Sequence, residues 1–366
     1  MRKQTVPAAL LAIVGFGLAA GGAHAQSSVT LYGIVDGGFT YTSNQGGKPN
    51  YQATAGNEQG SRWGLLGTED LGGGNHAVFR LENGFNLMNG TASANGRIFG
   101  RQAWVGLASD RYGTLTLGRQ YNAAQDSLEP LQVAGDTVQY ATHPFDVDDI
   151  NNTFRTDNSI KYVTPNFRGL QINAMYALSG NAGNFATNRS YSVGATYANG
   201  PWHLGAAYVM LDHPATDTTG AIPSDNYFTF LKGISRQRIY GAGGLYDIGD
   251  ASVGLMYTNT RFELTPANQY RTYQNAEASL RYRVTPALHA ALGETYTNVS
   301  TNGKVDSWHY WQTTAGLQYF LSKSTDVYAD LLYQRATNAV AQIEGASGPS
   351  SSHTQWMAVT GIRHKF

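Results

Sequence analysis

Residues 276–284 read Ala-Glu-Ala-Ser-Leu-Arg-Tyr-Arg-Val, and this stretch decides the fold. Apolar or aromatic side chains stand at every second position, and polar or charged side chains stand between them. Because successive side chains of a β-strand point to opposite faces, the alternation predicts a strand with one apolar and one polar face. Residues 311–319 alternate in the same way. In a soluble sandwich the apolar face would form the core, whereas in a membrane barrel it would face lipid.

Short alternating runs recur along the chain from residue 29 onward and predict sixteen strands. The predicted ranges are 29–41, 61–70, 75–86, 99–109, 113–121, 157–164, 169–178, 190–198, 202–211, 237–247, 251–262, 273–284, 287–297, 309–320, 325–336 and 354–366. The connections between them alternate between short and long, and the long ones fall near 42–60, 87–98, 122–156, 179–189, 212–236, 263–272, 298–308 and 337–353. Bacterial outer-membrane barrels have an even strand count, short periplasmic turns and longer external loops. The pattern therefore predicts an all-β protein, a transmembrane 16-stranded antiparallel β-barrel.

The composition agrees with a barrel. The chain has 366 residues, 43 Gly, 23 Tyr and no Cys, and only 14% of its residues are charged. No internal apolar run approaches the roughly 20 residues of a membrane helix. The lack of Cys excludes a disulfide framework and a thiolate metal site. No metal site or cofactor is predicted.

The N-terminal residues have the features of a secretory signal peptide. Arg2 and Lys3 precede an apolar run from Val6 to about Ala20, and Ala23-His24-Ala25 provides a cleavage site of the A-x-A type. The prediction is a cleaved signal at 1–25 and a single barrel domain at 26–366. Removal of the signal leaves 23 basic and 25 acidic residues, a balance that gives no support to nucleic-acid binding.

The chain ends in an apolar strand with the aromatic Phe366 as its last residue, in the sequence Gly361-Ile-Arg-His-Lys-Phe366. Together with the stretches 28–36, 61–74, 79–85, 99–107, 115–121 and 158–167, this ending resembles Gram-negative general diffusion porins, and in particular the β-proteobacterial branch. The resemblance covers essentially the whole mature chain. It implies a homotrimer in outer-membrane lipid and lipopolysaccharide, passive diffusion of small hydrophilic solutes and ions, and a third external loop that folds inward. It also implies that Phe366 is a signal for the barrel assembly machinery.

The third long loop, 122–156, is rich in acidic residues and has no Lys or Arg from Asn122 to Phe154. Loops of this length are usually functional or disordered. We expect it to narrow the pore, with Asp126, Glu129 and Asp136 as the constriction acids. Asp146-Val-Asp-Asp149 is expected to face solvent rather than to bind a divalent ion.

Arginines are expected on the opposite side of the pore. Arg62, Arg80 and Glu82 alternate with apolar neighbours and should therefore point into the lumen. The resemblance extends this basic wall to Arg62, Arg80, Arg101, Arg119 and Arg155. Arg119 shares the parity of the apolar Leu115 and Leu117, so only a twist at the strand end would turn it inward. Opposite charges across a narrow aqueous gap orient polar solutes, which predicts a permeation role. Salt bridges that only stabilise the lumen are the alternative.

Three other functions compete with a general porin. An outer-membrane hydrolase is disfavoured because the chain has no G-x-S-x-G, P-loop or H-E-x-x-H motif, although a Ser-His-Asp site can be scattered in sequence. A substrate-specific channel with an aromatic slide would also use many Tyr and Trp, but interfacial girdles account for these residues. A purely structural or adhesive barrel would not conduct. The prediction is a non-enzymatic general porin whose ion selectivity the sequence leaves open.

Overall fold

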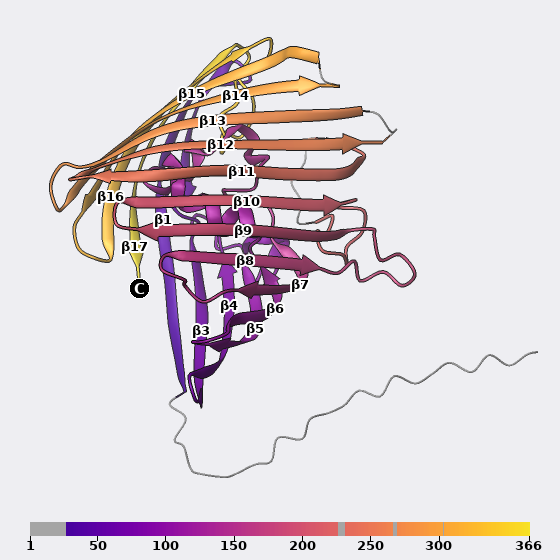
Figure 1. Ribbon diagram of the computed structural model, residues 1–366. Coiled ribbons are helices and arrows are strands. Elements are labelled where there is room, and N and C mark those ends of the chain that lie inside the picture. The colour runs from indigo at the N-terminus through magenta and orange to yellow at the C-terminus, as the bar shows by residue number, and fades with distance from the viewer. Residues whose placement is uncertain (1–26, 226–230, 266–268, 303) are drawn as a thin grey trace, which may run out of the picture.

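One antiparallel sheet that closes on itself forms the barrel in the computed structural model, which describes residues 27–225, 231–265, 269–302 and 304–366. Within these ranges the strands are β1 (Ser28–Gln45), β2 (Lys48–Ala55), β3 (Arg62–Gly72), β4 (Asn75–Gly84), β5 (Gln102–Ser109), β6 (Gly113–Gln120), β7 (Thr156–Val163), β8 (Leu170–Ala177), β9 (Arg189–Asn199), β10 (Trp202–Asp212), β11 (Ile234–Ile248), β12 (Ala251–Leu264), β13 (Gln269–Arg283), β14 (Leu288–Thr301), β15 (Lys304–Phe320), β16 (Thr325–Thr337) and β17 (Thr354–Lys365). From β3 to β17 each strand pairs with the next, and β1 pairs with β17 (Figure 1). Closure pairs the backbone donors and acceptors of every edge, which is what a hydrocarbon environment requires.

β2 and β3 occupy one position in the ring. The first half of β1 pairs with β3 up to Ile34↔Arg62, and the second half pairs with β2 from Gly37↔Ala55 onward. The seventeen strands therefore make sixteen positions. This confirms the predicted 16-stranded antiparallel barrel, and each predicted strand overlaps an observed one.

The first long connection differs from the prediction. The sequence predicts a loop at 42–60, but β1 and β2 continue as a hairpin that turns at Gly46 and Gly47, which have φ of +61° and +96°. The chain then leaves the sheet between β2 and β3. There the Asp36 carboxylate accepts hydrogen bonds from the backbone N–H groups of Glu58 and Gln59, both at 2.8 Å. This bend holds residues 56–61 inside the barrel, next to the functional site.

The seam between the first and last strands is closed by Phe366. Its N–H donates to the Gly33 carbonyl at 3.0 Å, and the Gly33 N–H donates to the Phe366 carbonyl at 2.9 Å. A Cβ at Gly33 would lie 2.4 Å from the Phe366 ring. Position 33 therefore needs glycine so that the terminal aromatic ring can lie across the seam.

The two faces of the sheet follow the predicted alternation. On β13, Leu280 and Tyr282 are exposed on the outer face, whereas Asn275, Glu277 and Ser279 are buried on the inner face. An outer wall of apolar and aromatic side chains is what the lipid side of a barrel needs. No helix in the described ranges is long and apolar enough to cross a membrane.

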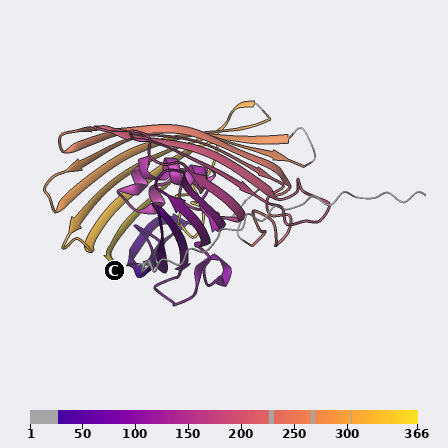
Figure 2. The same ribbon diagram turned by 60° about the horizontal axis from the view of Figure 1, so that its bottom comes forward.

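The third long loop, residues 121–155 between β6 and β7, lies inside the ring of strands, as predicted (Figure 2). It starts with α2 (Ala123–Leu128), whose N-terminus is fixed by Asn122: the Asn122 side chain accepts from the Ala124 N–H at 2.9 Å. Pro130 has no N–H to continue the helix, and α2 gives way to the 3₁₀ turn η1 (Glu129–Leu131). The other short helical elements are η2 (Val133–Gly135), η3 (Gln139–Ala141), η4 (Pro144–Asp146) and, in the second long loop, α1 (Ser93–Gly96).

Apolar packing keeps the third long loop against the wall. Leu128, Ile150 and Phe154 of the loop are buried in one cluster with the inward-facing Val209 and Ile239 of β10 and β11. Full burial of each large apolar side chain contributes roughly 1.5–3 kcal/mol. The loop therefore has a core of its own inside the barrel. The predicted signal peptide, residues 1–25, lies outside the described residues.

Candidate functional site

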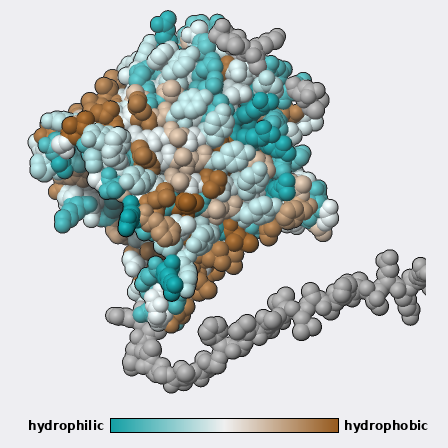
Figure 3. Space-filling model, in the orientation of Figure 1, coloured by the Kyte–Doolittle hydropathy of each residue, from teal (hydrophilic) through white to brown (hydrophobic). Residues whose placement is uncertain are grey.

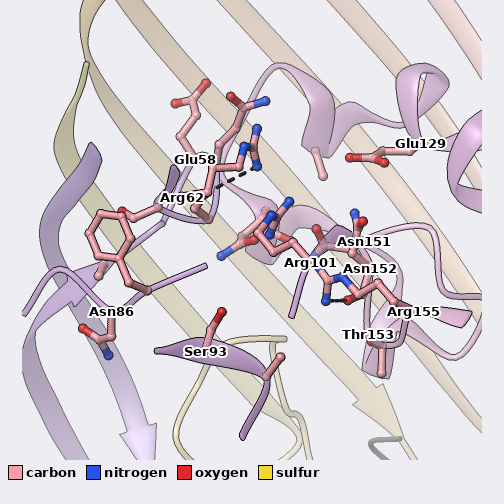
Figure 4. A pocket seen from close by; sticks show the side chains of 18 of the residues that line it. Glu58, Arg62, Asn86, Ser93, Arg101, Glu129, Asn151, Asn152, Thr153 and Arg155 are labelled. Atoms are coloured by element: carbon pink, nitrogen blue, oxygen red, sulfur yellow. Dashed lines mark hydrogen bonds between the residues drawn. The ribbon is translucent and has the colours of Figure 1, made fainter. Parts of the chain in front are cut away.

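A cavity of about 730 Å³ lies between the third long loop, the inward bend that joins β2 to β3, and the loop between β4 and β5. Its lining comprises Ala55, Glu58, Gln59, Gly60, Ser61, Arg62, Phe85, Asn86, Ser93, Ala94, Asn95, Arg101, Glu129, Gln132, Ala134, Gly135, Gln139, Asn151, Asn152, Thr153, Arg155, Ser224 and Asp225. Figure 4 shows the arginine side chains in the middle of the cavity and Glu129 across from them on the loop. Charges of opposite sign therefore face each other across the narrowed lumen.

Three of the five predicted arginines line this cavity. Arg101 is held extended, because its Nε donates to Glu82 Oε1 at 2.7 Å and its Nη2 donates to the Tyr121 hydroxyl at 2.8 Å. Arg62 donates to the Gly60 carbonyl at 3.4 Å, and Arg155 donates to the Asn152 carbonyl at 2.7 Å. These contacts direct the three guanidinium groups into the cavity.

Arg80 and Arg119 are not at the cavity. Arg80 shares the inner face of β4 with Glu82, but its guanidinium lies 5.8 Å from the Tyr32 ring centroid and 5.9 Å from that of Trp104. Arg119 is buried, forms an ion pair with Asp157 and donates to the Gly100 carbonyl at 2.8 Å. The pairing of β6 with β7 has a register shift between Gly118 and Gln120, so the strand is irregular at Arg119. Arg119 packs within the wall and does not line the cavity.

Glu129 is the only one of the three predicted acids that lines the cavity. Asp126 forms an ion pair with Lys161 of β7, and Asp136 forms one with Arg281 of β13 at 2.6 Å. Neither Asp126 nor Asp136 therefore lines this cavity, and their role as constriction acids stays a prediction. The reason is local: α2 ends between Asp126 and Glu129, so these two side chains leave the loop in different directions.

The carboxyl group of Glu129 is hard to ionise. Burial raises its pKa, and this effect outweighs the opposing effects of a hydrogen bond from the Asn152 side chain and of the charges of Arg101, Arg62 and Arg155. Burial likewise raises the pKa of Glu58, on the inward bend, to about 7. Guanidinium groups stay charged at any physiological pH. The positive charges of the cavity are therefore permanent, while the negative ones depend on pH.

Because of their different positions, Glu129 and Asp126 should differ in their effect on the ion selectivity of the channel. Glu129→Gln should raise the permeability of chloride relative to potassium, whereas Asp126→Asn should leave it unchanged, because only Glu129 faces the cavity. Reversal potentials in a planar bilayer under a salt gradient measure the ratio. Lowering the pH should shift the wild-type channel in the same direction as Glu129→Gln, since a raised pKa means that Glu129 takes up its proton at a higher pH than an exposed glutamate. Equal shifts for the two substitutions would contradict this assignment.

The anchors of the third long loop were missed by the sequence reasoning. They lie on the inner faces of several strands, and two of them are on β13, where Glu277 accepts from the Val133 N–H at 2.7 Å and Arg281 donates to the Gln132 carbonyl at 2.7 Å. Both residues belong to the alternating stretch 276–284, whose polar face was expected to line water. The charged side chains on that face were the available signal in the sequence. The sequence does not show that they bond a loop more than a hundred residues earlier.

A buried histidine links the same strand to the loop. His143 Nδ1 lies 2.6 Å from Asp148 Oδ2, and its Nε2 lies 3.4 Å from Glu277 Oε2. Burial opposes protonation of His143, but the charges and hydrogen bonds of Asp148 and Glu277 outweigh burial and raise its pKa to about 10. The imidazolium therefore joins a loop carboxylate to a wall carboxylate. We call His143, Asp148 and Glu277 the loop latch.

The acidic segment 146–149 corrects a further expectation. Asp146, Asp148 and Asp149 are buried rather than exposed to solvent. Asp146 accepts from the Asn151 N–H at 2.9 Å and the Thr153 N–H at 3.0 Å, while Asp149 accepts from the Asn122 side chain at 2.6 Å. These carboxyl groups shape the loop from within.

Two other long loops meet over the cavity. Arg97, in the loop that follows β4, lies 2.7 Å from Asp225, in the loop that follows β10. Asn95 also donates to the Asp225 carbonyl. Ser93, Asn95 and Asp225 are part of the cavity lining, so this contact narrows the entrance from the end that carries the long loops.

Comparisons with known proteins identify the family. The sequence profile of the family described as Gram-negative porin matches residues 8–339. An outer membrane porin protein of Bordetella pertussis is 36% identical over 285 residues, which span 71% of this chain and 70% of that protein. Outer membrane porin protein 32 of Delftia acidovorans is 29% identical over the full length of both chains.

Solved structures agree with these relatives. The anion-selective porin from Comamonas acidovorans superimposes with a TM-score of 0.77 at 25% identity, covering 93% of this chain and 100% of that chain. The OmpF porin of Salmonella typhi, with a TM-score of 0.63 and 18% identity over 92% of this chain and 97% of that one, shares the fold. This protein is an outer-membrane β-barrel that forms a diffusion channel for small solutes and has no enzymatic role. The chain belongs to the Gram-negative porin family.

Proposed function

We propose that the channel prefers anions, and that the preference arises at the cavity between Arg62, Arg101, Arg155 and the third long loop. The observation that carries the proposal is the asymmetry of charge: the guanidinium groups of Arg62 and Arg155, beside that of Arg101, which pairs with Glu82, face Glu129, a carboxyl group whose pKa burial raises. The two other acids in the lining already form ion pairs: Glu58 with Arg363 at 3.4 Å, and Asp225 with Arg97. Rings of positive charge select anions in water-filled pores. The structural relative from Comamonas acidovorans is an anion-selective porin, which supports the same direction.

The experiment is single-channel recording of the mature protein in a planar bilayer with a potassium chloride gradient. Large ohmic steps are expected, with a reversal potential that reports a chloride-to-potassium permeability ratio above one. Dilute salt should increase the ratio, because the Debye length grows from about 8 Å at physiological ionic strength to about 30 Å at 0.01 M. A ratio below one at neutral pH would contradict the proposed anion preference, but it would not contradict the existence of the channel.

A general channel is favoured over a substrate-specific one. Phe85 is the one aromatic residue in the lining of the described cavity, whereas an aromatic slide for sugars would need a row of them. Most of the lining is small, amide or charged. Conductance that saturates with one solute at low concentration would instead indicate a specific channel.

We infer a homotrimer in outer-membrane lipid and lipopolysaccharide; one relative, OmpT of Vibrio cholerae, is described in a trimer form. We also infer that residues 1–25 are removed as a signal peptide, that residues 26–366 form one barrel domain, and that Phe366 is read by the barrel assembly machinery. The position of the Phe366 ring across the seam at Gly33 supports a terminal signal located where the last strand meets the first.

A further inference from the structure

The inward bend, residues 56–61, is longer than the gap in the sheet that it bridges. The neighbouring strand β1 pairs with β3 up to Ile34 and with β2 from Gly37 onward, so the six residues of the bend stand opposite only two. A regular antiparallel ladder pairs residues one to one, so the surplus has to leave the sheet. It leaves at Gly56, which has φ of +71° and where a Cβ would lie 2.9 Å from Gly60 Cα. The surplus residues therefore form a tight turn.

Asp36, one of the two β1 residues opposite the bend, bonds the bend at its start, middle and end. Its carbonyl accepts from the Gly56 N–H at 2.9 Å. Its carboxylate Oδ2 accepts from the N–H groups of Glu58 and Gln59, both at 2.8 Å. Its own N–H donates to Ser61 Oγ at 3.1 Å. One fully buried residue therefore fixes the path of the whole bend.

The second oxygen of the Asp36 carboxylate bonds the wall. Tyr328 of β16 donates its hydroxyl to Asp36 Oδ1 at 2.6 Å. Hydrogen bonds to an ionised acceptor are roughly twice as strong as those between neutral groups, so the carboxylate ties the bend firmly to the sheet. Asp36 is fully buried and is not in the lining of the cavity. It can therefore act on solutes only through the bend.

The bend forms one side of the cavity. Four of its residues are in the lining: Glu58, Gln59, Gly60 and Ser61. Figure 4 shows Glu58 and Arg62 on one side of the cavity and Glu129 on another. Arg62 directly follows the bend and donates to the Gly60 carbonyl at 3.4 Å, so the bend also directs this guanidinium group. A displacement of the bend would therefore change both the width and the charge of the narrowed lumen.

The bend also meets the third long loop. The Gln139 N–H donates to the Asn57 carbonyl at 2.8 Å, and the Tyr140 hydroxyl donates to Asn57 Oδ1 at 2.9 Å. The third long loop has its own attachments to the wall, namely its apolar cluster and the loop latch. The bend and the loop are thus two elements in contact, each with a separate anchor on the barrel.

We propose that the inward bend is a second constriction element of the channel and that Asp36 is the residue that positions it. The size limit of the pore is then set by two attached segments, because the third long loop faces the bend where it would otherwise face a plain wall. The proposal concerns the width of the channel and does not depend on the proposed preference for anions.

The test compares Asp36→Ala with the wild-type porin. The N–H groups of Glu58 and Gln59 lose their charged acceptor, so amide hydrogen exchange of residues 56–61, followed by mass spectrometry, should accelerate on the order of a hundredfold. In planar bilayers the single-channel conductance should increase, and larger polyethylene glycols should enter the pore than enter the wild type. Asp36→Asn should give intermediate values, because its amide oxygen is a neutral acceptor. If Asp36→Ala does not fold, the isosteric Asp36→Asn carries the test.

Two controls separate the bend from general damage to the wall. Tyr328→Phe removes the partner of Asp36 Oδ1 and leaves Oδ2 bonded to the bend, so hydrogen exchange and conductance should stay close to the wild type. Asp212→Ala removes another buried carboxylate, which ends β10 and pairs with Arg189 and Arg236. Figure 3, in the orientation of Figure 1, shows hydrophilic side chains gathered over these right-hand strand ends. Asp212→Ala should leave the size limit unchanged.

Each other outcome contradicts one part of the proposal. Fast exchange of residues 56–61 with an unchanged polyethylene glycol limit would show that the bend does not narrow the pore. Exchange as slow as in the wild type would show that Asp36 does not position the bend. Equal widening in Asp212→Ala, or a large rise in chymotrypsin cleavage within 121–155, would assign the widening to the wall or to the third long loop. A wild-type channel that prefers cations would contradict the proposed anion preference and leave this result unaffected.

Discussion

Replacing Arg62 and Arg155 together by glutamate should reverse the ion preference of the channel. Both side chains line the cavity, and the double substitution changes the local charge by four units at the place where the third long loop narrows the lumen. A unit charge about 7 Å from an ion in water contributes about 0.6 kcal/mol, and salt at 0.1 M screens roughly half of that. The four charge units together lower the entry of chloride and raise the entry of potassium by roughly eightfold each. The chloride-to-potassium permeability ratio should therefore fall on the order of fiftyfold and drop below one.

Arg101 is left in place in this experiment because it bonds Glu82 and Tyr121, and its loss would disturb the wall. The reversal potential under a tenfold salt gradient measures the ratio, and the effect should grow as the salt is diluted. Arg335→Glu, on the outer face of β16, is the control and should have no effect. A double variant that keeps the wild-type ratio would show that selectivity is set elsewhere in the channel.

Removing His143 should release the third long loop while the barrel stays closed. In His143→Ala the carboxylates of Asp148 and Glu277 remain buried without the cation between them. Breaking a buried pair in this way costs about 3–5 kcal/mol, which corresponds to a more than hundredfold rise in the population of the detached loop. The sheet itself keeps its strand pairs, so the loss is local.

Limited proteolysis with chymotrypsin measures this release, because Tyr140 and Phe154 are buried in the attached loop. Cleavage within 121–155 should become more than a hundredfold faster, and single-channel currents should become larger and noisier. His203→Gln is the control, since His203 pairs with Asp247 near the surface of β10 and does not contact the loop. Adding Glu277→Gln to His143→Ala should restore part of the protection by removing one buried charge. Equal cleavage rates in wild type and His143→Ala would show that apolar packing alone holds the loop.

The same latch gives a pH dependence with a definite sign. The pKa of His143 is raised from 6.5 to about 10, so the protonated form stabilises the attached loop. This stabilisation is fully present below about pH 6.5 and is lost as the pH rises through about 10. Chymotrypsin cleavage of the wild-type loop should therefore accelerate in alkaline buffer, and His143→Ala should lack that acceleration.

The strand count and the two faces of the wall could be predicted from the sequence. Alternation with period two is a local property, and hairpins connect neighbours in sequence, so stretches such as 276–284 contain enough information to place their own residues. Closure followed from the need to pair every backbone group in a membrane. The hairpin extension at 42–55 was missed because its alternation is weak and its turn, Gly46-Gly47, is equally typical of a long loop.

The identity of the residues at the cavity depended on tertiary structure. Asp126 and Glu129 are three positions apart on an acidic loop and look equivalent in sequence, yet one pairs with Lys161 and the other faces three arginines. The loop is not a regular strand or helix, so no periodic pattern in its sequence predicts its path. It is set by contacts such as Val133 with Glu277, 144 residues apart, and by the closed wall that brings them together. The sequence by itself determined a barrel with an acidic loop and a basic wall, because these features follow from patterns among residues that are close together in the chain. Only the folded ring decided which acid meets which arginine, because that depends on distances between residues far apart along the chain.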